Sequence, residues 1–168
     1  GTFVGAPKVV DGYRNEALDF NGSSDSVEIV TSESLAETAG EITMEAWVFR
    51  RALGTNEIIS KWDNAMNGII HFEARDTGGM RFCMRKDDDS KVADFTTTET
   101  FPTEKWTHIA EVYDGGTAIV YFDGVEAGSI DGAGEMRENE NAKWWIGSMY
   151  ATDRWFDGLM DEVCIWKK

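Results

Sequence analysis

The fold is decided by the last stretch of the chain, residues 155–166 (WFDGLMDEVCIW), read together with residues 17–27 (ALDFNGSSDSV) near the other end. In both stretches apolar and polar residues alternate, a glycine marks a turn, and an acidic residue stands where the turn passes into a strand. They match as a first and a last strand. If these strands pair, the chain closes into one sandwich, and we expect such a domain to bind a ligand rather than to catalyse a reaction.

Period-two alternation continues through nearly the whole chain, which predicts an all-β protein. Turn residues that tolerate positive φ separate the strands, and Asp123-Gly124 is the strongest hairpin signal among them. Residues 32–38 could form one helical turn, which is too short to change the fold class. The predicted strands are 17–20, 26–30, 42–50, 57–61, 68–75, 80–86, 91–95, 107–113, 118–122, 126–130, 143–148 and 159–166.

Length and charge limit the classes of protein to which the chain can belong. Its 168 residues suit one domain with its own core, and no apolar run is long enough to cross a bilayer. The net charge of −15, from 31 acidic and 16 basic residues, argues against nucleic acid and anionic membranes as partners. It suits cations such as Ca²⁺ and neutral ligands. The chain starts without an initiator methionine or a signal-peptide pattern, so we expect a monomeric module excised from a larger protein.

The two cysteines, Cys83 and Cys164, lie far apart inside predicted strands, which is not the close spacing of a metal-thiolate site. Alternation places both on faces opposite the apolar residues of their strands. This pattern favours two free thiols, although one disulfide would form if the two strands were neighbours.

Seven short motifs occur in order along the chain: ALDFNG at 17–22, ITMEAWV at 42–48, IISK at 58–61, KWTHIA at 105–110, AIVYFDG at 118–124, IGS at 146–148 and FDGLMDEVCIW at 156–166. Together they resemble the laminin G-like, concanavalin A-like jelly roll. The resemblance implies a two-sheet antiparallel β-sandwich with its first and last strands adjacent in the outer sheet. It implies one laminin G-like domain over residues 1–168, with a core at about 17–166. The superfamily includes glucanases, lectins, carbohydrate-binding modules and adhesion modules, so function must be argued from a site.

The residues do not support an enzyme. Glucanases on this fold place two carboxylates on one strand as E-x-D-x-x-E, and this chain has no such run. The spacing of Glu73 and Asp76 puts them on opposite faces, as does that of Asp161 and Glu162, while residues 138–140 read as a polar loop. The histidines, His71 and His108, lie inside strand patterns, and no serine stands on a nucleophile-type turn. We therefore predict no catalytic residues, and a degenerate glycoside hydrolase is the least favoured alternative.

The resemblance implies a structural calcium ion. In concanavalin A-like jelly rolls, Ca²⁺ commonly joins the turn after the first strand to the aspartate that begins the last one. Carried over to this chain, the ligands are Asn21, Gly22, Asp25 and Asp161. Asn21 stands where the family has aspartate, so an amide replaces one carboxylate. The alternative is that Asn21 and Asp25 make an Asx-turn and Asp161 caps a bulge.

Seven tryptophans must be divided between packing and ligand binding. Trp47, Trp106 and Trp166 match aromatic positions of the family, and we assign them to packing. Trp144 and Trp145 are consecutive in one strand, so one must face inward and the other outward. We expect Trp144 in the core and Trp145 exposed.

Trp62 and Trp155 lie in loops rich in the polar groups that bind sugar hydroxyls, while a tryptophan ring stacks on the apolar face of a sugar. The candidate ligand-binding residues are Trp62, Asp63, Asn64, Tyr150, Arg154 and Trp155. The alternative is that each loop tryptophan covers an edge of the core.

The sequence thus predicts a noncatalytic, lectin-like carbohydrate-binding module with a structural calcium ion, in an extracellular or cell-surface protein. The alternative from another class is a protein-binding adhesion or spacer module with the same fold.

Overall fold

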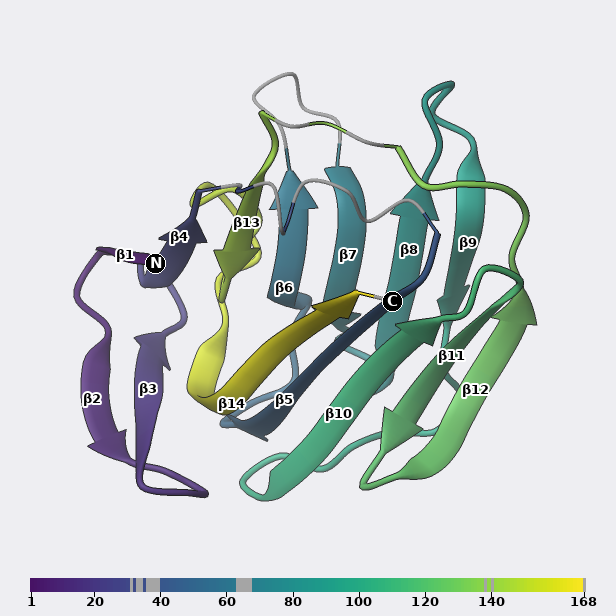
Figure 1. Cartoon of the computed structure of the whole chain (residues 1–168). Coiled ribbons are helices and arrows are strands. Elements are labelled where there is room, and N and C mark those ends of the chain that lie inside the picture. The colour runs from purple at the N-terminus through teal and green to yellow at the C-terminus, as the bar shows by residue number, and fades with distance from the viewer. Residues whose placement is uncertain are drawn as a thin grey trace.

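The computed structural model describes residues 1–30, 32, 35, 40–62, 68–137, 139 and 141–167. They form two antiparallel sheets of seven strands each, packed face to face as a sandwich (Figure 1). Sheet A has the order β1-β4-β13-β6-β7-β8-β9, and sheet B has the order β12-β11-β10-β5-β14-β3-β2. This architecture confirms the predicted all-β sandwich. Among the described residues, no helix has the length and apolar character needed to span a membrane.

The strands of both sheets are short, apart from β5 and β14. Those of sheet A are β1 (Thr2–Val4), β4 (Ser26–Ile29), β13 (Lys143–Ile146), β6 (Asn56–Trp62), β7 (Gly68–Ala74), β8 (Met80–Arg85) and β9 (Lys91–Thr96). Those of sheet B are β12 (Val125–Asp131), β11 (Thr117–Phe122), β10 (Trp106–Tyr113), β5 (Ile42–Arg50), β14 (Asp157–Lys167), β3 (Glu16–Asn21) and β2 (Lys8–Asp11). All twelve predicted strands are present. The short strands β1 and β2 were not predicted, and most of the possible helical turn lies outside the described residues.

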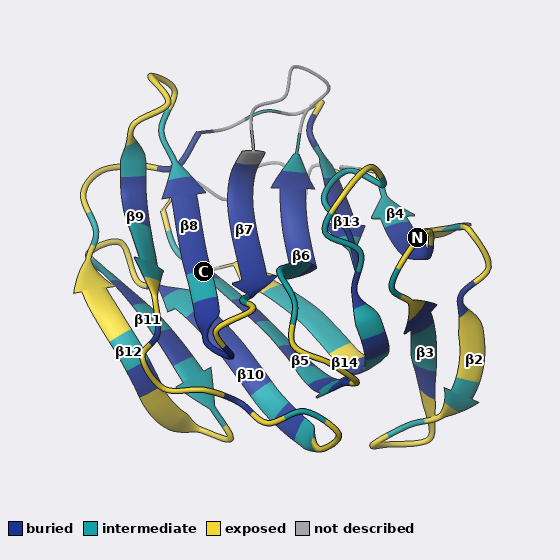
Figure 2. Ribbon diagram, turned by 180° about the vertical axis from the view of Figure 1, so that it is seen from behind, coloured by how far each residue is buried: buried dark blue, intermediate teal, exposed yellow. Residues whose placement is uncertain are grey.

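The core forms because one side of each central strand is apolar. In β5, every second residue from Ile42 to Arg50 is buried, while those between, such as Glu45 and Trp47, are partly exposed. The inner faces of both sheets contribute to one hydrophobic cluster. Figure 2 shows β6, β7 and β8 buried along most of their length, so both faces of these sheet A strands are covered.

The two ends of the chain pair as predicted. Strand β14 lies between β3 and β5, and its pairing with β3 runs from Asp157 opposite Asn21 to Met160 opposite Leu18. The hairpin at Asp123-Gly124 is also confirmed, because it joins β11 and β12 with φ values of 49° and 79°. Two positive φ values in a two-residue loop suit the twist of a tight hairpin.

The structure corrects several predictions about side chains. Trp47 and Trp106, which we assigned to packing, lie on the outer face of sheet B and not in the core, and Trp166, assigned in the same way, is 57% exposed. Trp144 faces the core as predicted, but Trp145 is only 4% exposed because the ring of Tyr150 packs against it. Alternation placed Trp144 and Trp145 on the correct faces, but it could not show which loop covers an outer face.

Both cysteines are free thiols. Cys83 lies in β8 and Cys164 in β14, which belong to different sheets, so the open question of a disulfide is resolved.

Glu111 is an exception to the apolar inner face of sheet B. It follows the inward-facing Ile109 in β10, is fully buried, and neither carboxyl oxygen has a hydrogen-bond partner among the described residues. Burial raises the pKa of Glu111 well above its ordinary value, because the charged form is poorly solvated. A neutral carboxyl group is therefore the form favoured in the folded protein.

We expect Glu111→Gln to stabilise the protein increasingly as pH rises. Between the ordinary glutamate pKa, which applies in the unfolded state, and the higher pKa in the folded state, only the folded protein keeps the Glu111 proton. The free energy of unfolding of the wild type therefore falls by about 1.4 kcal/mol per pH unit across this range. Below the ordinary glutamate pKa this penalty disappears. Urea denaturation of both proteins from about pH 5 to about pH 8 measures the difference. Glu99→Gln, at an exposed position, is the control, and a pH-independent difference for Glu111→Gln would contradict the prediction.

Candidate functional site

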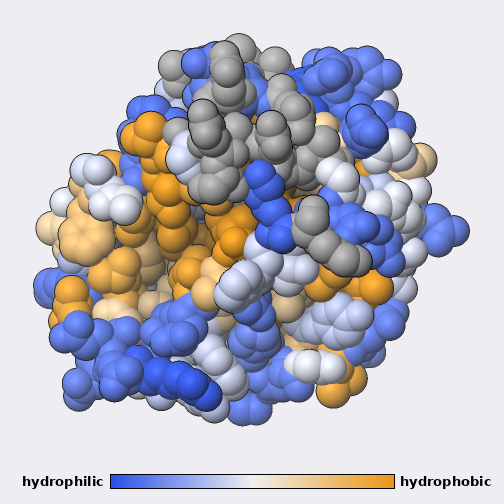
Figure 3. All heavy atoms as spheres, viewed as in Figure 1, coloured by the Kyte–Doolittle hydropathy of each residue, from blue (hydrophilic) through white to orange (hydrophobic). Residues whose placement is uncertain are grey.

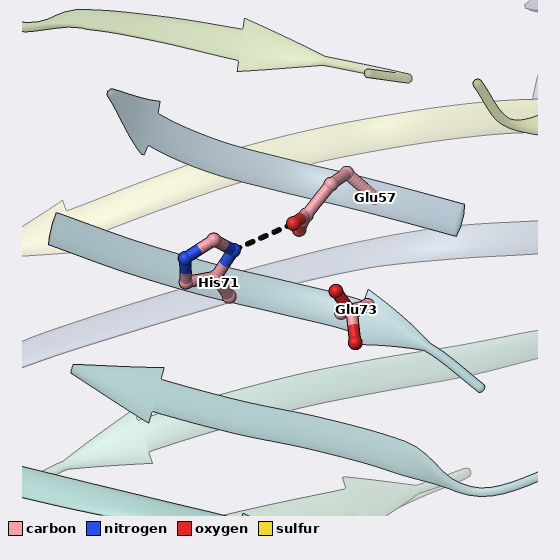
Figure 4. Close-up of side chains that lie close together, drawn as sticks. All are labelled: Glu57, His71 and Glu73. Carbon is pink, nitrogen blue, oxygen red and sulfur yellow. Dashed lines mark hydrogen bonds and ion pairs between the residues drawn. The ribbon is translucent and has the colours of Figure 1, made fainter. Parts of the chain in front are cut away.

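Three titratable side chains meet on the outer face of sheet A: Glu57 from β6, and His71 and Glu73 from β7 (Figure 4). Pairing of the two strands sets Glu57 opposite Glu73, and Ser60 opposite His71. Because Ile70 and Phe72 point into the core, the alternating residues His71 and Glu73 must point outward. The cluster is thus a consequence of strand register.

The cluster is closed to solvent although it lies on an outer face. Glu57 and Glu73 are 0% exposed and His71 is 2% exposed. One ligand atom from each lies within 4.8 Å of the others, and Nδ1 of His71 is 2.6 Å from Oε1 of Glu57. Burial raises the pKa of Glu57, while the neighbouring His71 acts in the opposite direction.

Arg154 neutralises this buried negative charge. Its Nη1 atom donates to Oε1 of Glu57 at 3.2 Å and also to Oε2 of Glu73. Arg75 donates to the other oxygen of Glu73. We call Glu57, His71, Glu73 and Arg154 the Arg154 cluster.

Arg154 belongs to the loop between β13 and β14, residues 147–156, which crosses the outer face of sheet A. The loop is fastened to β6 because Glu57 N–H donates to the Arg154 carbonyl at 2.9 Å, and Ser60 Oγ donates to the Ser148 carbonyl at 3.0 Å. Tyr150, Ala151 and Arg154 have φ values of 55°, 51° and 52°. Non-glycine residues in this region cost about 1 kcal/mol each or more, and such strain often gathers at binding sites.

A second ionic group lies beside the cluster on β8 and β9. Arg81 donates two hydrogen bonds to Asp94, at 2.8 and 2.9 Å, and Lys91 contacts the same carboxylate. Partial burial opposes ionisation of Asp94, but these hydrogen bonds outweigh it and lower the pKa of Asp94 to about 2. Arg81 also lies 3.9 Å from Glu73, so the charged groups form a continuous band across the sheet.

Aromatic rings flank the Arg154 cluster on the β6 and β13 side. The ring of Trp62 meets that of His71 edge-on at a centroid distance of 5.0 Å, and Trp145 meets Tyr150 in the same way at 5.2 Å. Two buried polar atoms here, Nε1 of Trp145 and Oε2 of Glu57, have no hydrogen-bond partner within the described part of the chain. One is a donor and the other is an acceptor.

The predicted ligand residues partly converge on this face. Trp62 and Arg154 are linked through His71 and Glu57. Tyr150 packs on Trp145, which lies opposite Ser60 on the same sheet. Trp155 is the next residue after Arg154, and its carbonyl accepts a hydrogen bond from Asn56 at 2.6 Å. The remaining two predicted residues, Asp63 and Asn64, lie outside the described residues.

Sequence reasoning missed Glu57, His71, Glu73 and Trp145 as members of one site. The H-x-E spacing places His71 and Glu73 on the same face of a strand, and the sequence alone is enough to predict this. Glu57 is fourteen positions from His71, so its place depended on the register of two strands.

The Arg154 cluster has the residue types of a metal or hydrolase site, but its contacts oppose both. A cation would have to displace Arg154 and Arg75 from Glu73. It would also have to break the hydrogen bond between His71 and Glu57. Glycoside hydrolysis needs the scissile bond to enter between two carboxyl groups. Here one guanidinium group contacts both carboxylates, and neither is exposed.

The structure does not gather the four predicted calcium ligands into one site. Asp157, rather than Asp161, lies opposite Asn21, and Asp161 is four residues further along β14, roughly 13 Å at the rise of a strand. Asn21 Oδ1 accepts N–H groups of Ser23 and Ser24, both at 2.9 Å, which is an Asx-turn.

Asp161 stands at a bulge in β14, where its carboxylate accepts N–H groups of Glu162 and Arg14, both at 2.7 Å. These contacts match the alternative reading of Asx-turn and bulge. A single calcium ion held by Asn21, Gly22, Asp25 and Asp161 together therefore does not fit the geometry.

An apolar hollow of about 400 Å³ lies between the sheets on the side of β3 and β4. Figure 3 shows hydrophobic side chains gathered in a hollow on this face. Its lining is mostly apolar and includes Leu18, Val27 and Ile146, while Glu16, Asp161 and Glu162 are its acidic residues.

Comparisons with known proteins agree with this architecture. The family model of the concanavalin A-like lectin/glucanases superfamily matches residues 21–168, and no curated protein matches the chain. Domain 4 of AbnA, a GH43 extracellular arabinanase from Geobacillus stearothermophilus solved with arabinotriose, is 22% identical with a TM-score of 0.74; the match covers 97% of this chain and 76% of that one.

Two other structures are similar over a smaller part of their own length. A Bacteroides ovatus protein assigned a carbohydrate-binding role is 21% identical with a TM-score of 0.66, covering 89% of this chain and 42% of that one. The binding domain of botulinum neurotoxin serotype G is 13% identical with a TM-score of 0.77, covering 99% and 42%. At these identities the likeness shows the fold alone.

We expect Arg154→Ala to lower the free energy of unfolding by about 3 kcal/mol, because it leaves two buried carboxylates without their shared partner. The loss should be smaller in mild acid, since burial raises the pKa of Glu57 and a protonated Glu57 needs no counter-ion. Urea denaturation at two pH values measures both effects. Arg75→Ala is the matched control, because Arg75 contacts only Glu73 in the cluster. Equal losses in the two variants would contradict a bridging role for Arg154.

Proposed function

The chain belongs to the concanavalin A-like lectin/glucanases superfamily, and we propose that it is a noncatalytic carbohydrate-binding module of an extracellular or cell-surface protein. Its binding surface is the outer face of sheet A over β13, β6 and β7. The ligand contacts are Trp62, Tyr150, Arg154 and Trp155, with Glu57 and Trp145 beneath them.

The observation that carries this proposal is an unpaired donor and an unpaired acceptor, both buried on the outer face of sheet A. Nε1 of Trp145 and Oε2 of Glu57 are buried without partners among the described residues, and each such atom costs about 1–3 kcal/mol. A sugar hydroxyl both donates and accepts, so one class of ligand could satisfy both. Trp145 packs under Tyr150 and Glu57 contacts Arg154, so a small shift of those two side chains gives access.

The surroundings favour a neutral sugar. The net charge of −15 repels anionic glycans, while the face itself balances acidic groups with Arg75, Arg81 and Arg154. Trp62 and Tyr150 offer ring surfaces for the C–H face of a sugar, and Arg154 offers donors for its hydroxyls. Support for a carbohydrate partner also comes from AbnA domain 4, whose structure contains arabinotriose.

The state of the carboxylates in the Arg154 cluster supports a noncatalytic role. Hydrolysis would need one of them to act as a general acid beside the scissile bond, and Arg154 holds both in ionic contact away from solvent. A protein-binding adhesion or spacer module is the alternative that the first experiment below can favour.

The proposal includes a calcium site without Asp161, at the turn that carries Asn21, Gly22 and Asp25. Asp25 is only 4% exposed, and its Oδ1 accepts the Ala6 N–H at 2.8 Å. The Ser24 carbonyl oxygen lies beside that carboxylate, since both would be 2.5 Å from a Cβ at position 5. Paired carboxylate and carbonyl oxygens are the ligands that Ca²⁺ prefers.

Binding is tested first on an array of neutral oligosaccharides that includes arabinotriose, and then by titration of the ligand against the indole N–H signals in nuclear magnetic resonance. We expect the Trp62 and Trp145 signals to shift. Trp62→Ala should weaken the oligosaccharide affinity, measured from the Trp145 indole signal, roughly tenfold, because it removes one stacking contact.

The matched control for that titration is Trp166→Ala, which removes an exposed tryptophan from sheet B and should leave the affinity at Trp145 unchanged. If no oligosaccharide binds, with or without calcium, the carbohydrate proposal fails and the protein-binding alternative is favoured. Release of reducing sugar from a bound oligosaccharide would contradict the noncatalytic role.

Calcium should raise the melting temperature relative to EDTA, because an ion that binds only the folded state stabilises it. We expect this increase in the wild type and in Asp161→Asn, and its loss in Asp25→Asn. Differential scanning calorimetry with and without EDTA provides the measurement. Equal melting temperatures for the wild type in the two conditions would rule out a calcium site at this turn.

A further inference from the structure

A second candidate site lies on the outer face of sheet B, on the other side of the sandwich from the Arg154 cluster. It is a hollow of about 680 Å³ whose lining is aromatic on one side and charged on the other. We call it the aromatic hollow, and its lining residues are Tyr13, Trp47, Lys105, Trp106, His108 and Asp123.

Strand register and one turn assemble the aromatic part. Pairing of β5 with β10 sets Trp47 opposite His108, and Phe49 opposite Trp106, on the face that points away from the core. Tyr13, from the turn between β2 and β3, stacks on Trp47 at a centroid distance of 3.6 Å with planes 14° apart. Its ring also meets Trp106 edge-on at 6.2 Å. Tyr13 and Trp47 therefore form a stacked pair, and the Trp106 ring lies beside it at an angle.

Asp161 holds the turn that carries Tyr13. Its Oδ2 accepts the Arg14 N–H at 2.7 Å, and Gly12 N–H closes the turn on the Asn15 carbonyl at 3.0 Å. A Cβ at Gly12 would lie 2.7 Å from that carboxylate oxygen, so only glycine lets the turn approach so closely. The last strand thus fixes the position of the Tyr13 ring.

The charged side of the hollow is also fixed in place. Asp123 Oδ1 accepts the His108 N–H at 2.9 Å, which anchors the β11–β12 turn against β10. Lys105 Nζ is 4.0 Å from Asp123 Oδ2, and His108 Nε2 is 3.3 Å from Glu45 Oε2. Acceptor and donor groups therefore stand beside the rings, and the charges of Lys105 and Asp123 cancel.

These rings are not needed to fill the core. They lie on the opposite face of β5 and β10 from the core residues Ala46, Val48 and Ile109, and Tyr13 is 45% exposed. Trp47 and Trp106 are partly exposed. Large aromatic groups that reach solvent together on a sheet face, beside polar groups, are typical of a binding surface.

We propose that the aromatic hollow is a second carbohydrate-binding site, which takes one ring of a neutral oligosaccharide. The C–H face of the sugar packs on the indole of Trp106 and on the stacked Tyr13–Trp47 pair, and its hydroxyls bond to Asp123 and Lys105. A neutral ligand suits a hollow with balanced charge in a strongly acidic protein. This site shares no residue with the Arg154 cluster, so the module could hold two glycan segments on opposite faces and gain avidity on a polymer.

The test titrates the whole protein with neutral arabino-, xylo-, cello- and malto-oligosaccharides and follows the indole N–H signals of Trp47, Trp106, Trp62 and Trp145. We expect at least one of these sugars to shift the Trp47 and Trp106 signals. The shifts should persist in Trp62→Ala, which alters only the first site. Tyr13→Ala, at an exposed turn, should weaken the affinity read at Trp106 roughly tenfold. Ile130→Ala, at an exposed position of β12 on the same sheet, is the control and should leave it unchanged.

The outcomes separate the two proposals. Shifts at Trp62 and Trp145 alone overturn the aromatic hollow and leave the first site standing. Shifts at Trp47 and Trp106 alone, sensitive to Tyr13→Ala, support the hollow and overturn the first site. No shift at any of the four signals with any sugar overturns both. If Tyr13→Ala alters the melting temperature, Lys105→Ala, at a side chain that is 65% exposed, provides the same affinity test at the rim.

Discussion

Both candidate binding surfaces depend on the insertion of β14 between β3 and β5. This strand joins the two ends of the chain in the middle of sheet B. At its start, it fixes the end of the loop that lays Arg154 across Glu57 and Glu73 on sheet A. At its bulge, it presents Asp161 to the turn that carries Tyr13 onto sheet B. A single strand register thereby positions a charged face and an aromatic face on opposite sides of the sandwich.

The two faces use different physical means to hold their side chains in place. On sheet A, buried carboxylates require Arg154 and Arg75 as counter-ions, and removing one partner would leave an uncompensated charge. On sheet B, stacking between Tyr13 and Trp47 orders the site with little buried charge. The stability of the first face therefore depends on charge and pH, whereas the second can lose a ring with less effect on folding.

Asp161 shows why a motif does not by itself assign a role. The resemblance points to a calcium ligand, and the aspartate does lie beside the first strands of the chain. Its partners are backbone N–H groups of Arg14 and Glu162, so its charge anchors a turn and a bulge. Strand β14 does join distant parts of the chain through Asp161. The partner of the carboxylate is the backbone N–H of Arg14 and not a calcium ion.

The sequence by itself determined the all-β class, the twelve predicted strands, the pairing of the end strands and the face on which most side chains lie, because period-two alternation is a local property of the chain. It could not show that Trp145 is covered, that Tyr13 stacks on Trp47, or that Glu57 meets His71 and Glu73. Those facts depend on which strands are neighbours, in which register, and on which loop crosses an outer face. The tertiary structure alone decided them, since contacts between residues far apart in the chain arise only when strands pair and loops pack.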